Sequence, residues 1–263
     1  MSIQGGFNAN VYESAVKGGS ANADHIGLTT RINPIVDPSN ILGKGTGRRG
    51  LYNIALGVVE PQISFDMLLN DKTFLTTYQD GQTAIPFLHL KTGSIGITLT
   101  NPYVNRVTVV ARTNEGLQVT VDLWAESGEA LTTQTWGSPS ASFYRWLDTE
   151  FQLDTTPETQ WWEWRYEINN NLQRLADVDS GGTREIVAKG RDVTGSLVKD
   201  LRSWTEFTEM MNTASEASLV LFTIKLDGTT LINSNGRWGR LEAPIPAEDL
   251  IAKRFPFTLL DVS

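Results

Sequence analysis

Alternation of apolar and polar residues with period two is the feature that most constrains this chain. The alternation is clearest at 117–125, where the apolar positions are Leu117, Val119, Val121, Leu123 and Ala125. Shorter alternating runs occupy 95–99 and 162–168. Because successive side chains of a β-strand face opposite sides, each run predicts a strand buried on one face. The denser apolar run 219–224 predicts a strand buried on both faces.

Helical patterns are few. Asn70 precedes a run in which Phe74 and Tyr78 lie four residues apart on one helix face, and Asn70 is expected to cap that helix. Asp200 precedes a second run, which begins at Leu201 and contains Trp204. A short third helix is expected over 247–253. The fold is therefore expected to be mostly β.

The two halves of the chain resemble each other in order. Four segments of the first half correspond, at shifts of 130 to 136 residues, to segments of the second: 63–67 to 193–197, 70–74 to 200–204, 85–91 to 219–225 and 119–123 to 255–259. The ordered series predicts a duplication. We expect two tandem β-sandwich domains, 28–127 and 160–263, each with a flanking α-helix. Phe74 and Trp204 would be the equivalent buried anchors of the two helices.

Two segments do not fit either domain. Residues 1–27 are expected to form an N-terminal arm, and residues 128–159 an extended linker or arm with a packed strand or hairpin around 143–153. Both are polar and rich in Gly, Ser, Thr or Asn, with sparse apolar anchors. Because such segments are too long for simple loops, we expect them to become ordered against partner chains.

The composition excludes several classes of protein. The chain of 263 residues has no cysteine and two histidines, so disulfides, thiolate catalysis and a His-rich metal site are ruled out. It has no apolar stretch long enough to span a membrane, and its first residues lack the pattern of a cleaved secretory signal. A net charge of −8 argues against a protein that reads DNA sequence.

Four further patterns are weak signals for chemistry. The glycine-rich run 43–50 lacks the spacing of a phosphate-binding loop and is interpreted as a turn. His89 is expected on a sheet surface and His25 in a polar arm. Asp177 and Asp179 could hold a cation with Asn171, although an exposed turn is the preferred interpretation. We predict no catalytic residue, no cofactor and no bound metal.

A tryptophan cluster opens the second half. Alternation places Trp162 and Trp164 on the face of Tyr166 and Ile168, which is expected to be a core face. Trp161 would point the other way and is the better candidate for an interface between subunits. The alternative is a stacking platform for sugars.

The segment from Trp164 to Arg174 resembles the opening strand of a phage tail tube domain. In that family an amphipathic strand ends in a turn like Asn169-Asn170, followed by an apolar residue and often arginine. The continuation through Gly190 to Leu197 is similar to the family's step into the next strand. The resemblance covers 160–263 directly and 28–127 through the internal repeat.

The resemblance implies a major tail tube protein of a long non-contractile (siphovirus) tail, in the version with two tube domains per chain. Such a protein is a structural component of the virion, made in the host cytoplasm, and not an enzyme. Single-domain members form hexameric rings, so three copies of this chain would form a homotrimeric pseudo-hexameric ring by self-assembly. Stacked rings would form the conduit through which DNA passes without specific binding.

The same resemblance implies contacts with tape-measure and tail-end proteins and none with a membrane. Asn169 and Asn170 become candidate interface residues. Family lumens tend to be acidic, and three chains of −8 would carry −24. Two alternatives stay open: a carbohydrate-binding, adhesin-type tail protein that uses the tryptophans, and a β-sandwich hydrolase.

Overall fold

The computed structural model of this chain describes residues 9–17, 19–37, 41–44, 51–55, 60–92, 95–131, 134–138, 142–176, 183–200, 219–239 and 252–260. The fold is mostly β, as the alternation predicts. In the first half the elements are β1 (Ala9–Ser14), β2 (Gly19–Asp37), β3 (Ile41–Lys44), β4 (Leu51–Ala55), β5 (Glu60–Leu69), α1 (Thr73–Tyr78), β6 (Phe87–Thr92), β7 (Ile95–Thr100), β8 (Tyr103–Arg112) and β9 (Gln118–Trp124).

The middle of the chain and the second half contribute the remaining elements. These are β10 (Ser127–Ala130), β11 (Gln134–Trp136), the 3₁₀ turn η2 (Trp146–Asp148), β12 (Thr149–Leu153), β13 (Thr156–Pro157), β14 (Trp161–Asn169), β15 (Leu172–Ala176), β16 (Thr183–Ala188), β17 (Asp192–Asp200), β18 (Val220–Leu226), β19 (Thr229–Trp238) and β20 (Ala252–Leu259). The alternating runs of the sequence correspond to β7, β9 and β14, and the dense run corresponds to β18.

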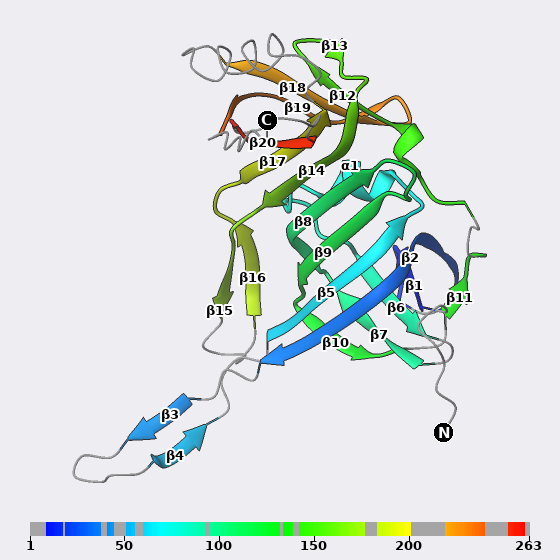
Figure 1. The fold of residues 1–263 in the computed structure, drawn as a ribbon. Helices are drawn as coiled ribbons and strands as arrows, with labels where there is room; N and C mark the ends of the chain where they lie inside the picture. Colours follow the sequence, from blue (N-terminus) through cyan, green and yellow to red (C-terminus); the bar gives the residue numbers. More distant parts are fainter. Residues whose placement is uncertain are drawn as a thin grey trace.

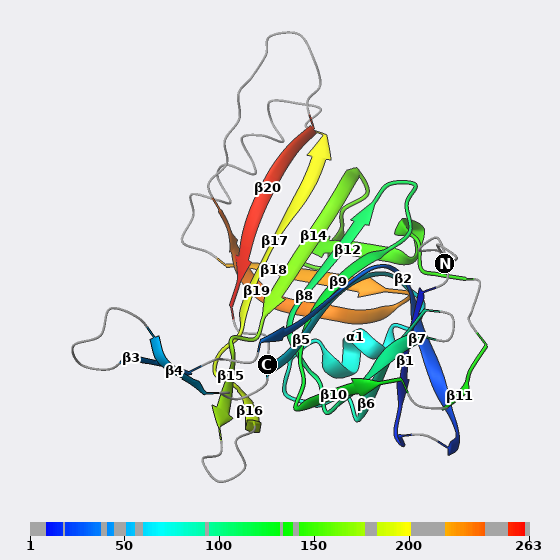
Figure 2. The same ribbon diagram turned by 90° about the horizontal axis from the view of Figure 1, so that it is seen from below.

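One antiparallel sheet runs through both halves of the chain. Its centre has the strand order β2-β5-β9-β8-β14-β17-β20 (Figure 1). Beyond β2 the sheet continues through β1, β6, β7 and β10, and beyond β20 through β19, β18, β12 and β13. Figure 2 shows that β18 and β19 cross one face of the central strands, while α1 and β6 lie against the same face farther along. Among the described residues, the central strands therefore have one face covered by other elements and one face, called the bare face below, that no other element covers.

The covered face holds a single described core. Every second residue of the central strands points into it, including Phe65, Val107 and Trp164, which are all fully buried or nearly so. Phe74 of α1 and Phe222 of β18 belong to the same cluster. Burial of this apolar surface is the main stabilising contribution to a two-layer fold.

The two halves repeat their strand pairing in the same chain order. In the first half β2 pairs with β5, β5 with β9, and the hairpin β3–β4 lies between β2 and β5 along the chain. In the second half β14 pairs with β17, β17 with β20, and the hairpin β15–β16 lies between β14 and β17. The pairs β1–β6 and β6–β7 likewise correspond to β12–β18 and β18–β19. This correspondence supports the predicted duplication, while the domain boundaries remain a prediction.

The structure differs from the sequence expectation in the two segments regarded as arms. Residues 9–14 and 19–27, within the expected arm 1–27, form β1 and the start of β2, with Val11, Tyr12 and Ile26 buried. Within 128–159, β12 pairs with β18 as part of the sheet, and it is the strand expected around 143–153. Bulges at Val11/Tyr12 and at Thr29/Arg31 shift the alternation, which is why these strands are hard to recognise in sequence.

The first predicted helix is confirmed as α1, but its cap is not Asn70. The Asn70 side chain donates to the carbonyl of Ser142, and Asp71 Oδ1 accepts from the amide of Thr73 at 2.8 Å. The helix expected from Leu201, with Trp204, lies outside the described residues. Of the third expected helix, 247–251 lie outside them too, and residues 252 and 253 begin β20 instead.

Candidate assembly surface

The two halves of the chain meet at a strand seam between β8 and β14. The two strands are antiparallel and in unbroken register from Glu163 opposite Arg112 to Asn169 opposite Arg106. Both strands place apolar residues on the covered face, so Trp164 lies across from Ala111 and Tyr166 from Val109. This seam joins the first half of the chain to the second in one sheet.

Asn170 lies at the end of the seam, directly after the last residue of β14. Its side chain is fully buried, and its Nδ2 donates to the carbonyls of Val104 (2.8 Å) and Gln79 (3.0 Å). Its backbone amide donates to the carbonyl of Asn105 at 2.8 Å. Gly81, at φ +67°, leaves room for the Asn170 side chain, because a Cβ on Gly81 would lie 2.6 Å from Asn170 Nδ2. Asn170 was a sequence-predicted candidate, and the structure places it inside the chain's own seam.

Residues at the end of α1 cross the same seam on its covered face. Gln79 Oε1 accepts from the hydroxyl of Tyr166 at 3.1 Å, and Gln79 Nε2 donates to the carbonyl of Leu231 in β19. At the helix start Lys72 pairs with Asp227 of the β18–β19 turn at 2.8 Å. Burial raises the pKa of Tyr166 above its usual value, so the hydroxyl stays a donor. The helix of the first half therefore contacts and stabilises strands of the second half.

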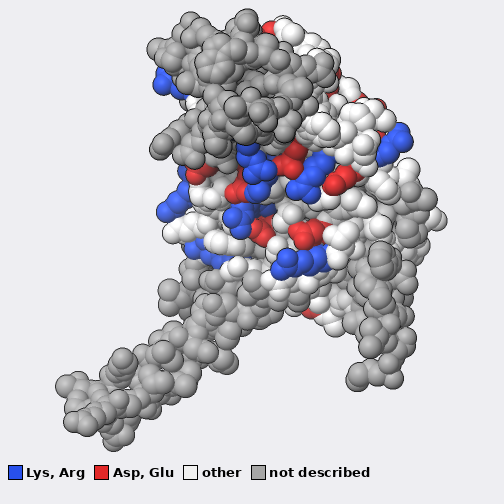
Figure 3. All heavy atoms as spheres, viewed as in Figure 1, with Lys and Arg blue, Asp and Glu red and all other residues white. Residues whose placement is uncertain are grey.

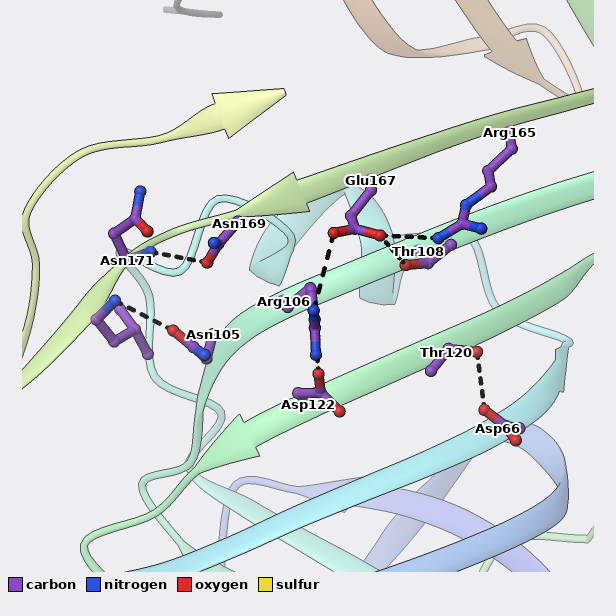
Figure 4. A network of polar contacts seen from close by, with 11 residues as sticks. Asp66, Asn105, Arg106, Thr108, Thr120, Asp122, Arg165, Glu167, Asn169 and Asn171 are labelled. Carbon is purple, nitrogen blue, oxygen red and sulfur yellow. Dashed lines mark hydrogen bonds and ion pairs between the residues drawn. The ribbon is translucent and has the colours of Figure 1, made fainter. Parts of the chain in front are cut away.

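The bare face of the seam carries a network of ion pairs (Figure 4). Arg106 Nε lies 2.8 Å from Asp122 and its Nη1 lies 3.9 Å from Glu167. Glu167 also accepts from Arg165 at 2.8 Å. Farther along, Glu163 lies 2.6 Å from Arg112 and 3.2 Å from Arg254 of β20. Hydrogen bonding to Asp122 and to Glu163 raises the pKa of Arg106 and of Arg112, respectively, above the usual value.

The charges on this face are of both signs. Figure 3 shows lysine or arginine and aspartate or glutamate intermingled over the central strands. The sequence already showed Glu163, Arg165 and Glu167 alternating with core residues of β14. It did not show their partners on β8, β9 and β20, because strand neighbours far apart in sequence follow from the fold and not from the pattern.

The tryptophan prediction is wrong in its assignment of faces. Trp164 is fully buried and its ring stacks on Tyr166, as expected. Trp162 is 52% exposed, whereas Trp161 packs against the core and against the rings of Trp146 and Trp164. A register shift between Trp161 and Glu163 exchanges the two sides. Trp162 is therefore the exposed member of the cluster.

The other residues predicted as anchors, interface residues or cation ligands lie at separate places in the structure or outside the described residues. Phe74 is buried at 1% exposure and lies 5.8 Å, ring to ring, from Tyr78. Asn169 is half-buried at the end of β14, where its Oδ1 accepts from the amide of Asn171. Trp204, Asp177 and Asp179 lie outside the described residues. Among the residues that the structure describes, no three His, Asp or Glu side chains are grouped to hold a metal ion.

His89 is buried in the sheet and not on its surface as expected. Its ring nitrogens lie 2.8 Å from Ser14 Oγ and 3.0 Å from Thr98 Oγ1. The Ser14 hydroxyl donates to the carbonyl of Val16, so Nε2–H of His89 donates to Ser14 and Nδ1 accepts from Thr98. Burial lowers the pKa of His89. A histidine that donates to the serine cannot act as its base, so this triplet does not form a nucleophilic site.

At two strand edges of the central sheet, the described residues place no further strand. On its side away from β5, β2 pairs with β1 only through Asp24–Leu28, and residues 29–37 have no further strand partner in the described part of the chain. At the other end, Gly236–Trp238 of β19 pair with Leu259–Phe257 of β20. On the opposite side of Arg237 and Trp238, the described residues again contribute no strand.

No protein-family model and no curated protein matches this chain. Among the described residues, none of the helices has the length and apolar character needed to cross a membrane.

Proposed function

We propose that this protein is a structural subunit that assembles with copies of itself, the tail tube subunit of a virion. The observation that supports the proposal best is the repeated strand order on either side of the β8–β14 seam. Two like units already pair edge to edge within one chain, and the first unit still has an open edge at β2. A tail tube is a ring of such units closed through their sheets, and closure removes open sheet edges.

The residue pairing between β8 and β14 predicts which residues of two neighbouring copies lie opposite each other. With Asp122 matched to Thr258, the strand pairings match Ser64 to Thr194 and Asn33 to Glu167. Arg106 pairs with Asp122, and Arg237 pairs with Thr258, so Arg237 occupies the place of Arg106. Because Glu167 lies opposite Thr108, two residues along β8 from Arg106, Asn33 of one copy is expected opposite Gly239 of the next, two residues along from Arg237.

The bare face points toward the axis of the proposed ring. The shorter strands and α1 thicken the molecule on the covered face only (Figure 2). A closed sheet curves away from its thicker side, so the bare face with its charged residues lines the lumen. The hairpins β3–β4 and β15–β16 extend from one end of the central strands (Figure 1), where they can reach a neighbouring ring.

Disulfide cross-linking tests this arrangement, because the chain has no cysteine of its own. Asn33→Cys and Gly239→Cys lie at opposite ends of the central sheet in one chain, but face each other across the proposed seam. Oxidation of this double variant should give covalent dimers and trimers and nothing larger. Asn33→Cys with Glu185→Cys, on the exposed face of β16, is the control and should give no discrete trimer. A double variant that stays monomeric on oxidation, or that forms a ladder beyond three, contradicts the proposal.

The sugar-binding alternative retains one supporting observation, the exposed ring of Trp162. Trp161 and Trp164 are packed into the protein, so a platform of several tryptophans is not formed. Thermal stabilisation by a panel of glycans that is lost in Trp162→Ala would favour this alternative, and its absence favours the structural subunit.

A further inference from the structure

The buried histidine of β6 lies beneath a short strand, β11. The ring of Trp136 in β11 lies 5.5 Å, centre to centre, from the ring of His89 and 5.0 Å from that of Tyr12. Lys91 follows His89 by two residues in β6 and so lies on the same side of the sheet, with its Nζ 4.5 Å from the centre of the Trp136 ring. Trp136 therefore covers the side of the sheet on which His89 lies.

β11 has the fewest strand contacts of the elements around His89. It has three residues, and among the described strands it pairs with β2 alone. A register shift between Gln134 and Thr135 interrupts that pairing, and the amide of Gly137 then donates to the carbonyl of Ala23 at 2.9 Å. β1 and β6, in contrast, each pair with strands on both sides. Because local opening occurs where the fewest contacts break, β11 is expected to open before its neighbours.

The hydrogen bonds of His89 fit the neutral ring only. Its Nε2–H donates to Ser14 Oγ, and its Nδ1 accepts from Thr98 Oγ1. A protonated ring has two donors and no acceptor, so the hydroxyl of Thr98 would lose the acceptor for its own proton. His89 and Thr98 are both completely buried. A positive charge on the ring would therefore be shielded from water while β11 is in place, and such a charge destabilises a fold unless it is paired.

The charged groups near His89 do not supply a free counter-charge. The titratable side chains on this side of the sheet are those of Lys91 on β6, Tyr12 on β1, His25 on β2 opposite Tyr12, and Glu129 on β10 opposite Thr98. Glu129 is already paired with Lys17. Burial raises the pKa of Tyr12, so this side chain stays neutral, and β7 and β11 contain no titratable residue. Protonation of His89 would therefore place a second cation beside Trp136, next to Lys91.

We infer that β11 is an acid-sensitive strap, which lies closed over neutral His89 and detaches from β2 when His89 takes up a proton. Detachment removes Trp136 from this side of the sheet, so water can solvate the protonated ring. Burial lowers the pKa of His89 while the strap is closed, whereas the uncovered ring titrates near its ordinary value of 6.5. The closed state therefore has its full stability above about pH 6.5 and loses it as the pH falls.

The strap belongs to the segment between β9 and β12, which joins the two halves of the chain. Its detachment would free part of that connection while the sheet itself stays paired. The inference does not depend on the proposed function, because it concerns contacts within one chain.

Hydrogen exchange followed by mass spectrometry on the full chain tests the strap. After correction for the intrinsic exchange rate, the protection factor of the amides at 135–137 should be constant above about pH 6.5 and fall by up to about tenfold per pH unit below it. Protection of β6 should stay constant over the same range, because that strand keeps both neighbours. Constant protection at 135–137 in the wild type, or an equal loss at β6, overturns the inference.

Two histidine variants assign the effect to one ring. His89→Gln keeps one donor for Ser14 and one acceptor for Thr98 but does not titrate, so its protection at 135–137 should not change with pH. His25→Gln replaces the other histidine of the chain and should keep the pH dependence of the wild type. A pH dependence that persists in His89→Gln, or that is lost only in His25→Gln, overturns the inference.

Trp136→Ala supplies a second test if circular dichroism shows that His89→Gln does not fold. Without the ring that covers His89, exchange at 135–137 should already be fast at neutral pH and should change little on acidification. Protection in Trp136→Ala that equals that of the wild type at neutral pH and falls with the same pH dependence would show that Trp136 is not the cover, and would overturn the inference.

Discussion

Asn170 joins the two halves of the chain through hydrogen bonds that no other residue type makes in the same way. Its amide supplies two donors to carbonyls of the first half, those of Val104 and Gln79, from a position fully shielded from water. A buried carbonyl that loses its donor costs about 1–3 kcal/mol. The residue therefore stabilises the seam between units.

Asn170→Ala should lower the free energy of unfolding by about 2–4 kcal/mol, because two buried acceptors lose their donor. Urea denaturation measures the change. Asn33→Ala, an exposed asparagine within β2, is the control and should change stability by less than about 0.5 kcal/mol. Equal effects for the two variants would show that Asn170 has no special role.

Glu13 makes the free energy of unfolding depend on pH. Burial, with Asp71 and Asp24 nearby, raises the pKa of Glu13 to about 7, and its Oε2 is buried without a hydrogen-bond partner. A carboxyl whose pKa is raised in the folded state stabilises the fold fully below its unfolded pKa of 4.5. That contribution is lost as pH rises to about 7.

Glu13→Gln should therefore match the wild type near pH 4.5 and become the more stable protein as pH rises, with the difference levelling off above about pH 7. Thermal unfolding over this range measures the difference, with Glu185→Gln on exposed β16 as the control. Desolvation lowers the pKa of half-buried His25 and of buried His89, so stability falls at the acid end, where both rings must be protonated. A pH-independent difference between Glu13→Gln and the wild type would contradict the assignment.

At the scale of elements, α1 shows what a short amphipathic helix contributes. The helix has only six residues, so its own propensity does not hold it in place. Phe74 and Leu75 are buried in the core, and Gln79 bonds to strands of the second half. The helix is therefore held by its contacts with the sheet.

Phe74→Ala should lower the free energy of unfolding by about 3–5 kcal/mol, because it removes a buried ring and leaves a cavity. Thr77→Ala, on the exposed side of the same helix, tests whether helix propensity alone is involved and should have little effect. Chemical denaturation of both variants separates the two. A cost for Phe74→Ala below about 1 kcal/mol would show that the ring is not a core anchor.

The strands that the sequence predicted are those with unbroken alternation. In β9, and in β14 from Trp164 onward, every second residue is apolar or aromatic, and the pattern gives both the strand and its buried face. In β1 and early β2 a bulge shifts the alternation, and buried residues such as Val11 and Tyr12 become neighbours in sequence. The exchange of Trp161 and Trp162 has the same cause. The polar partners of Asn170 and Glu163 were not predictable, because they come from strands far away along the chain.

At the scale of the whole molecule, the central sheet is both the scaffold of the chain and the proposed wall of an assembly. The β8–β14 seam joins the two halves of the chain, and among the described residues no further strand lies beside residues 29–37 of β2 or beside the end of β19, which are the edges proposed to meet a neighbour. Two units per chain require three chains to supply six units. The sequence predicts the internal repeat, whereas the seam that makes one sheet from two halves required the structure.

Electron cryomicroscopy of the purified, assembled protein tests the central proposal most directly. The proposal predicts closed rings of three chains, with β2 of each chain paired beside Arg237 of the next and the charged face of the central sheet toward a hollow axis. Rings of six chains, a charged face turned outward, or a protein that stays monomeric under every assembly condition would contradict it.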